Sequence, residues 1–177
     1  MVYNSHIHRR NSIRLRHYDY SQEGMYFITI CTKDRKSYFG KIVDHQMVLN
    51  EKGRMAKLFW YKIGKIHNFV ELKEFVIMPN HIHGIIILKN QMKQGDLEKY
   101  EKHNLMVYHS FKPKSISSLI GHYKAAVKKW MNNNNYGDFC WQRNYYEHII
   151  RDDNRLKTIS HYIVNNPKNW KEDRFFP

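Results

Sequence analysis

The sequence predicts a mixed domain in which β-strands alternate with α-helices and at least two strands pair antiparallel. Segments rich in β-branched and aromatic residues alternate with segments whose apolar residues recur at helical spacing. The two strongest strand segments follow each other directly, separated by a Pro-Asn turn. The 177 residues suit one domain with a substantial core, residues 1–177, and the 42% hydrophobic residues argue against disorder.

The first half of the chain predicts four strands and one helix. Residues 25–32 are β-branched and aromatic, which is typical of a strand, and residues 46–49 predict a short second strand. Asn50 is placed to cap a helix over residues 51–66. Residues 69–78 predict another strand, which leads through Pro79-Asn80 into a strand from His81 to Leu88, so these two should pair antiparallel.

The second half begins with a polar segment, residues 89–110, that is expected to be a surface excursion. A helix is predicted for residues 115–131, with an apolar face and a basic edge that is a candidate for phosphate contacts. Residues 139–150 form an aromatic, strand-like segment, and a last helix is predicted for residues 153–165, ending before Pro167.

His81 and His83 are the most informative residues for function. Side chains alternate along a strand, so residues two apart project from the same face and offer two metal-capable nitrogens together. Gly84 would let a backbone or a ligand approach closely. A buried strand histidine is nevertheless often a hydrogen-bonded core residue, and the spacing alone leaves that interpretation open.

The charge predicts a polyanionic partner. Thirty Lys and Arg against sixteen Asp and Glu give a net charge of +14 and a pI near 9.7, and nucleic acid is the first candidate. Cationic side chains follow phosphates while aromatic faces stack on unpaired bases, which suits single-stranded or hairpin nucleic acid. No apolar stretch spans a bilayer, no secretory signal is found, and two cysteines predict no disulfide framework, so a cytoplasmic protein without membrane partners is expected.

Tyr162 and Asn166 lie four residues apart at the end of the last predicted helix and therefore share a face. A helical tyrosine is by itself usually a packing residue. Tyr145 and Tyr146, near His148, are rival nucleophiles, although their aromatic surroundings favour packing or base stacking.

These residues together resemble the single-tyrosine HUH transposases, and most closely the REP-associated tyrosine transposases of the IS200-like family. The matching blocks cover most of the chain in the right order: residues 10–15, 18–21, 26–32, 76–85, 141–151 and 162–167.

The resemblance implies an α+β, ferredoxin-like domain with a central antiparallel sheet and helices packed on one side. It implies that His81 and His83 bind Mg²⁺ or Mn²⁺ and that Tyr162 is the nucleophile. Asn166 stands where related transposases have a glutamine metal ligand, so its place in the ligand set is open, and a water or another carbonyl oxygen is an alternative. From coordination chemistry alone Mn²⁺ or Zn²⁺ is as plausible as Mg²⁺, because two imidazoles are unusual ligands for Mg²⁺.

The implied activity is metal-dependent cleavage and rejoining of single-stranded DNA at hairpin, palindromic sequences through a 5′-phosphotyrosine. The implied protein is either a monomer or a homodimer with a shared active site. A basic arm, about residues 1–20, is a candidate DNA contact or a solvated tail. The candidate DNA-binding residues are Arg9, Arg10, Arg14, Arg16, Lys112 and Arg143.

Two other functions remain open at this stage. A non-catalytic ferredoxin-like module would bind nucleic acid through its aromatic residues and would use the histidines structurally. A zinc-dependent hydrolase is disfavoured, because no third ligand and no general-base glutamate stand beside the histidine pair.

Overall fold

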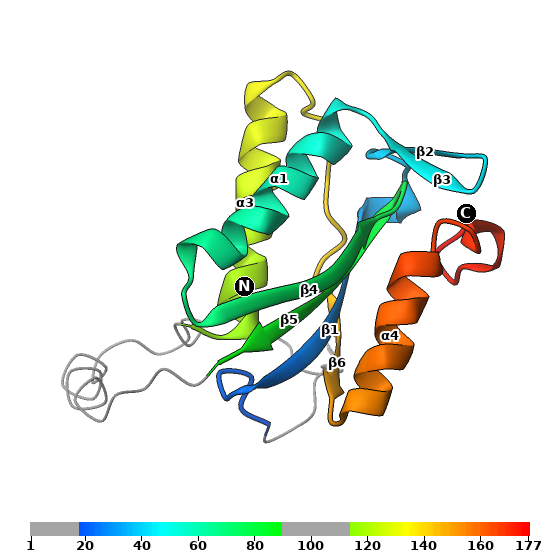
Figure 1. Cartoon of the computed structure of the whole chain (residues 1–177). Helices are drawn as coiled ribbons and strands as arrows, with labels where there is room; N and C mark the ends of the chain where they lie inside the picture. The colour runs from blue at the N-terminus through cyan, green and yellow to red at the C-terminus, as the bar shows by residue number, and fades with distance from the viewer. Residues whose placement is uncertain (1–17, 90–113) are drawn as a thin grey trace, which may run out of the picture.

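A computed structural model describes residues 18–89 and 114–177 of the chain (Figure 1). Most of the predicted N-terminal arm, with Arg9, Arg10, Arg14 and Arg16, lies outside the described residues, as do Lys112 and nearly all of the predicted surface excursion. Within the described residues, no helix combines the length and apolar character that crossing a bilayer requires.

The described part of the chain contains a four-stranded antiparallel sheet with the strand order β4-β5-β1-β6. Its strands and the two helices that connect them occur along the chain as β1, α1, β4, β5, α3 and β6, which is the βαββαβ order of a ferredoxin-like fold. The predicted α+β class is therefore confirmed. The bounds are β1 Gly24–Cys31, α1 Glu51–Ile66, β4 Val70–Ile77, β5 His81–Leu88, α3 Ile116–Asn133 and β6 Tyr146–Ile150.

A hairpin of β2 (Gly40–Val43) and β3 (Gln46–Leu49) is inserted between β1 and α1, and α4 (Asp153–Asn165) follows β6. Strand β2 was not predicted. Two single 3-10 turns complete the described elements, η1 (Lys33–Arg35) after β1 and η2 (Trp170–Glu172) after α4. Each of the three α-helices that the structure describes begins directly after a capping residue. The side chains of Asn50, Ser115 and Asp152 accept hydrogen bonds from backbone amides in the first turns of α1, α3 and α4.

The two faces of the sheet are covered by different helices (Figure 1). Helices α1 and α3 pack on the face that carries Ile82 and Ile86, within the larger hydrophobic core. Helix α4 lies on the other face, where Ile159 and Ile163 pack against Ile85 in a second core. The expectation that the helices lie on one side is therefore wrong, because α4 has an apolar face of its own to bury.

The predicted strand over residues 139–150 is also wrong in its first half. Only Tyr146–Ile150 pairs with β1, and Trp141 makes an isolated bridge to Thr32. The loop before β6 is instead held by Lys124, whose ammonium donates to the carbonyls of Gln142 and Asn144 at 2.7 and 2.8 Å, and by Lys128. Two of the three lysines of α3, Lys124 and Lys128, are thus engaged by the protein itself.

Candidate active site

His81 and His83 stand on β5 and face α4, with 0% and 1% of their surface exposed. Their rings are 4.5 Å apart between centroids, as the alternation along a strand requires. Strand β1 supports the second histidine, because Thr29 is its cross-strand partner and the Thr29 hydroxyl lies 2.7 Å from His83 Nδ1. Gly84 does not open the strand to a ligand as expected, since the space beside it is filled by the Trp60 ring of α1.

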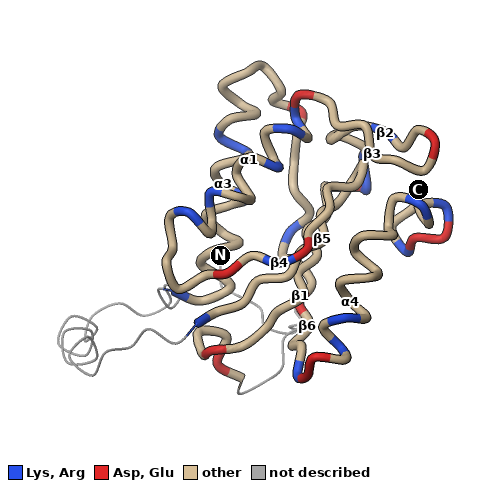
Figure 2. Tube along the Cα trace, in the orientation of Figure 1, with Lys and Arg blue, Asp and Glu red and all other residues tan. Residues whose placement is uncertain are grey.

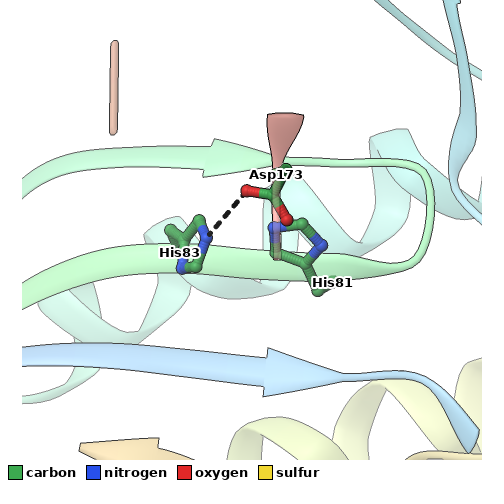
Figure 3. Close-up of side chains that lie close together, drawn as sticks. All are labelled: His81, His83 and Asp173. Atoms are coloured by element: carbon green, nitrogen blue, oxygen red, sulfur yellow. Dashed lines mark ion pairs between the residues drawn. The ribbon is translucent and has the colours of Figure 1, made fainter. Parts of the chain in front are cut away.

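Asp173, in the segment after α4, brings a carboxylate to the histidine pair (Figure 3). Its side chain is fully buried, and its Oδ2 lies 4.0 Å from His83 Nε2. One ligand atom from each of Asp173, His81 and His83 lies within 4.8 Å of the other two. Two imidazoles and a carboxylate at this spacing can hold one divalent cation after small side-chain shifts.

Tyr162 on α4 reaches the same place. Its hydroxyl lies 3.2 Å from His83 Nε2 and 3.2 Å from Asp173 Oδ2, to which it donates. The tyrosine side chain is 41% exposed, so the hydroxyl sits where the buried cluster meets the surface. Partial burial, and then the negative charge of Asp173, raise the pKa of Tyr162 to about 12, so the phenol is protonated at neutral pH.

Asn166 completes the group, four residues after Tyr162 and 2% exposed. Its amide nitrogen donates to Asp173 Oδ2 at 2.7 Å. Its amide oxygen is buried and has no hydrogen-bond partner in the part of the chain that the structure describes. A buried oxygen without a partner is costly, and a bound cation would relieve that cost.

Both histidines are neutral at physiological pH. Burial lowers the pKa of His81 to about 3. Burial also lowers the pKa of His83, an effect that the neighbouring His81 reinforces and that Asp173 partly opposes. A neutral imidazole keeps a nitrogen lone pair, which is the form that binds a metal ion.

The C-terminal segment covers the histidines. The ring of Phe175 lies 4.8 Å from His81 and 5.9 Å from His83 between centroids, and Trp170 lies 6.0 Å from His81. Phe175 is itself buried. The nitrogen atoms of the pair are therefore shielded from solvent by side chains that follow α4 in the sequence.

The structure thus brings together four residues that the sequence singled out, His81, His83, Tyr162 and Asn166, and adds Asp173. No sequence pattern pointed to Asp173, which is one acidic residue in a terminal segment without hydrophobic periodicity.

The other candidates stand elsewhere. Tyr145 packs against the main core and donates to Ser117 on α3. Tyr146 pairs with Thr29 on the face of the sheet that carries the histidines, and its ring lies 6.0 Å from Phe175. Arg143 is exposed in the loop before β6.

Basic side chains are also concentrated on α1, one of the two helices that cover the opposite face of the sheet. Figure 2 shows Lys and Arg along α1 and α3. Helix α1 carries Lys52, Arg54, Lys57, Lys62 and Lys65 against the single acidic residue Glu51. Among the residues that the structure describes, none of these five side chains forms an ion pair, so α1 presents a positive surface there.

Comparison with known proteins finds similar curated sequences and similar solved structures. A Haemophilus influenzae protein of unassigned function is 42% identical over 174 residues, covering 98% of this chain and 97% of the relative. A second H. influenzae protein, named as a candidate REP-associated tyrosine transposase, is 31% identical over 150 residues, covering 84% of this chain and 73% of the relative. No protein-family model matches the chain.

One of the similar solved structures is a REP-associated tyrosine transposase bound to a REP hairpin. It superposes with a TM-score of 0.55 at 19% identity and covers 87% of this chain and 72% of that one, so the likeness is one of fold. Fold and relatives together define a transposase, a DNA-processing enzyme. The chain belongs to the REP-associated tyrosine transposase family.

Proposed function

We propose that this protein cleaves and rejoins single-stranded DNA at hairpin sequences through a 5′-phosphotyrosine formed on Tyr162. The observation that carries the proposal is the position of the Tyr162 hydroxyl, 3.2 Å from His83 Nε2 and at the mouth of a buried cluster of metal-capable side chains. The fold neighbour, a transposase bound to a REP hairpin, supports a DNA hairpin as the substrate.

The residues of the cluster fit a divalent cation. His81 Nε2 and Asn166 Oδ1 are buried atoms with no hydrogen-bond partner among the described residues, and both can act as ligands. His83 and Asp173 would supply a second nitrogen and a carboxylate oxygen. This mixed nitrogen and oxygen set suits Mn²⁺ and can accept Mg²⁺, and the cation would polarise a scissile phosphate and offset the charge that builds on its oxygens.

Tyr162 would attack the phosphorus of a phosphodiester. The new bond joins the phenol oxygen to phosphorus, the bond from phosphorus to the 3′-oxygen breaks, and the strand leaves as a 3′-hydroxyl. The phenol must lose its proton and the leaving 3′-oxygen must gain one. Asp173 Oδ2, which already accepts the hydroxyl hydrogen bond, is the acceptor at hand, and the proton can pass from it to the 3′-oxygen. A 3′-hydroxyl of a second strand can reverse the step, because the phosphotyrosine keeps the phosphoester linkage.

All of these side chains come from one chain, which supports action as a monomer. Histidines, carboxylate and tyrosine meet without a second copy. A homodimer that exchanges its tyrosines would instead need α4 to leave the sheet face on which Ile159 and Ile163 are buried. Light scattering on the purified protein, alone and with hairpin DNA, distinguishes the two arrangements.

The function is tested with labelled single-stranded hairpins taken from palindromes that flank the gene. The protein is incubated with the DNA in Mn²⁺ or in EDTA, and covalent adducts are separated on denaturing gels. An adduct is expected in Mn²⁺ only. It should disappear in Tyr162→Phe and persist in the matched variant Tyr146→Phe, because Tyr146 shares the face of the sheet but not the hydroxyl contact with His83.

Two outcomes would contradict the proposal. Tight hairpin binding without an adduct in any divalent cation would favour the non-catalytic nucleic-acid-binding module. An adduct that survives in Tyr162→Phe but is lost in Tyr146→Phe would move the nucleophile to β6.

A further inference from the structure

Asn80, in the turn between β4 and β5, is a buried residue with three side-chain hydrogen bonds. Its amide nitrogen donates to the carbonyl of Arg35 at 3.0 Å and to the carbonyl of Phe175 at 2.8 Å. Its amide oxygen lies 2.8 Å from His81 Nδ1. The side chain is 1% exposed, so solvent does not compete for these contacts.

The two backbone carbonyls fix which way this amide points. A carbonyl oxygen only accepts hydrogen bonds, so the NH₂ group of Asn80 must face Arg35 and Phe175. The reversed amide would place its oxygen against both carbonyls and lose both bonds. The Asn80 oxygen therefore faces His81 and can only accept there.

The proton on His81 follows from that orientation. Because Asn80 Oδ1 accepts, His81 Nδ1 carries the hydrogen and donates it. A neutral imidazole has one N–H, so His81 Nε2 keeps its lone pair. That nitrogen is buried and lacks a hydrogen-bond partner within the described segments. The other histidine differs, because the hydroxyl of Thr29 beside His83 Nδ1 can donate or accept.

We propose that Asn80 is a positioning residue that sets the tautomer of His81, so that the buried Nε2 presents its lone pair to the divalent cation. The inference rests on the proposed function for the identity of the ligand, while the tautomer is a property of the metal-free protein. Two segments that are distant in the sequence orient the Asn80 amide, because the carbonyls that accept its hydrogen bonds belong to η1 and to the C-terminal segment. Partners behind a metal-binding histidine typically change metal affinity by about 10- to 100-fold.

The tautomer is read from two-bond ¹H–¹⁵N spectra of the metal-free protein with ¹⁵N-labelled histidine, in which the His81 signals are those lost in His81→Gln. Wild type should show the proton on Nδ1. Asn80→Ala should give a mixture of tautomers and about 10- to 100-fold weaker Mn²⁺ binding by calorimetry. Thr29→Val should leave the His81 tautomer unchanged, because that threonine contacts the other histidine.

A proton on His81 Nε2 in the wild-type protein would overturn the inference, and this measurement needs no variant other than the His81→Gln protein used for assignment. Wild-type tautomer and wild-type Mn²⁺ affinity in a folded Asn80→Ala protein would overturn it as well. The expected tautomers without Mn²⁺ binding by any variant would support the role of Asn80 and refute the metal site of the proposed function.

Discussion

Replacing Gly84 by alanine should destabilise the protein through one identifiable clash. A Cβ at this position would lie 2.3 Å from Trp60 Cζ2 and 3.0 Å from Cε2 and Cη2 of the same ring. Ordinary contacts begin near 3.4 Å, so the gap is too short by more than an ångström. The ring cannot move aside easily, because it is fully buried, stacked on Phe75 and edge-on to Tyr123.

The magnitude follows from overpacking. Extra methyl groups in a well-packed core cost about 1–3 kcal/mol, and a rigid indole in contact favours the upper end. For a chain of this length each kcal/mol lowers Tm by about 2–4 °C, so Gly84→Ala should melt roughly 6–12 °C below wild type. Gly121→Ala is the matched control, since a Cβ there meets nothing within 4 Å and α3 should gain up to about 1 kcal/mol.

Thermal denaturation followed by circular dichroism measures these shifts. Trp60→Phe removes the part of the ring that meets the new methyl group, so the double variant Trp60→Phe with Gly84→Ala should lose less stability than the two single variants add up to. A decrease in Tm below about 2 °C for Gly84→Ala, or strict additivity in the double variant, would show that the new methyl group does not clash with Trp60.

Three further predictions concern the site and the loop before β6. Mn²⁺ at a hundredfold excess over its Kd should stabilise the protein by about 2.7 kcal/mol, which is measured as a rise in Tm. EDTA should reverse this rise, and His83→Ala should lack it. An equal rise in His83→Ala would place the ion elsewhere. Asp173→Asn removes a negative charge, so the pKa of Tyr162 in the metal-free protein should fall from about 12. It should stay above 10.0, because burial is the larger cause of the raised pKa. NMR of ¹³Cζ-labelled tyrosine measures this pKa, and an unchanged value would contradict the contact between Asp173 and Tyr162. Lys124→Met should cost about 1–3 kcal/mol in urea unfolding, because two carbonyls lose a charged donor, whereas the exposed Lys129→Met should be nearly neutral.

Local sequence patterns were sufficient for most of the elements. Apolar residues at helical spacing, together with capping residues, predicted helices over residues 51–66 and 153–165, and the structure has the same bounds. The paired strands β4 and β5 also lie where they were expected. Strand β2 was missed because it is only four residues long and none of them is fully buried: two are half-buried and two are exposed. The strand over residues 139–150 was too long because lysine contacts to backbone carbonyls, which leave no pattern in the sequence, hold its first half as a loop.

Residue spacing was enough to place His81 with His83 on one strand face and Tyr162 with Asn166 on one helix face, because the two pairs are two and four residues apart. The meeting of the two pairs is a result of the three-dimensional fold, since Tyr162 and His83 are 79 residues apart in the chain. The fold also brought Asp173 to the site and oriented Asn80 between three segments. Contacts of this kind depend on which sheet face α4 buries and on how the terminal segment folds back, and no local periodicity encodes either.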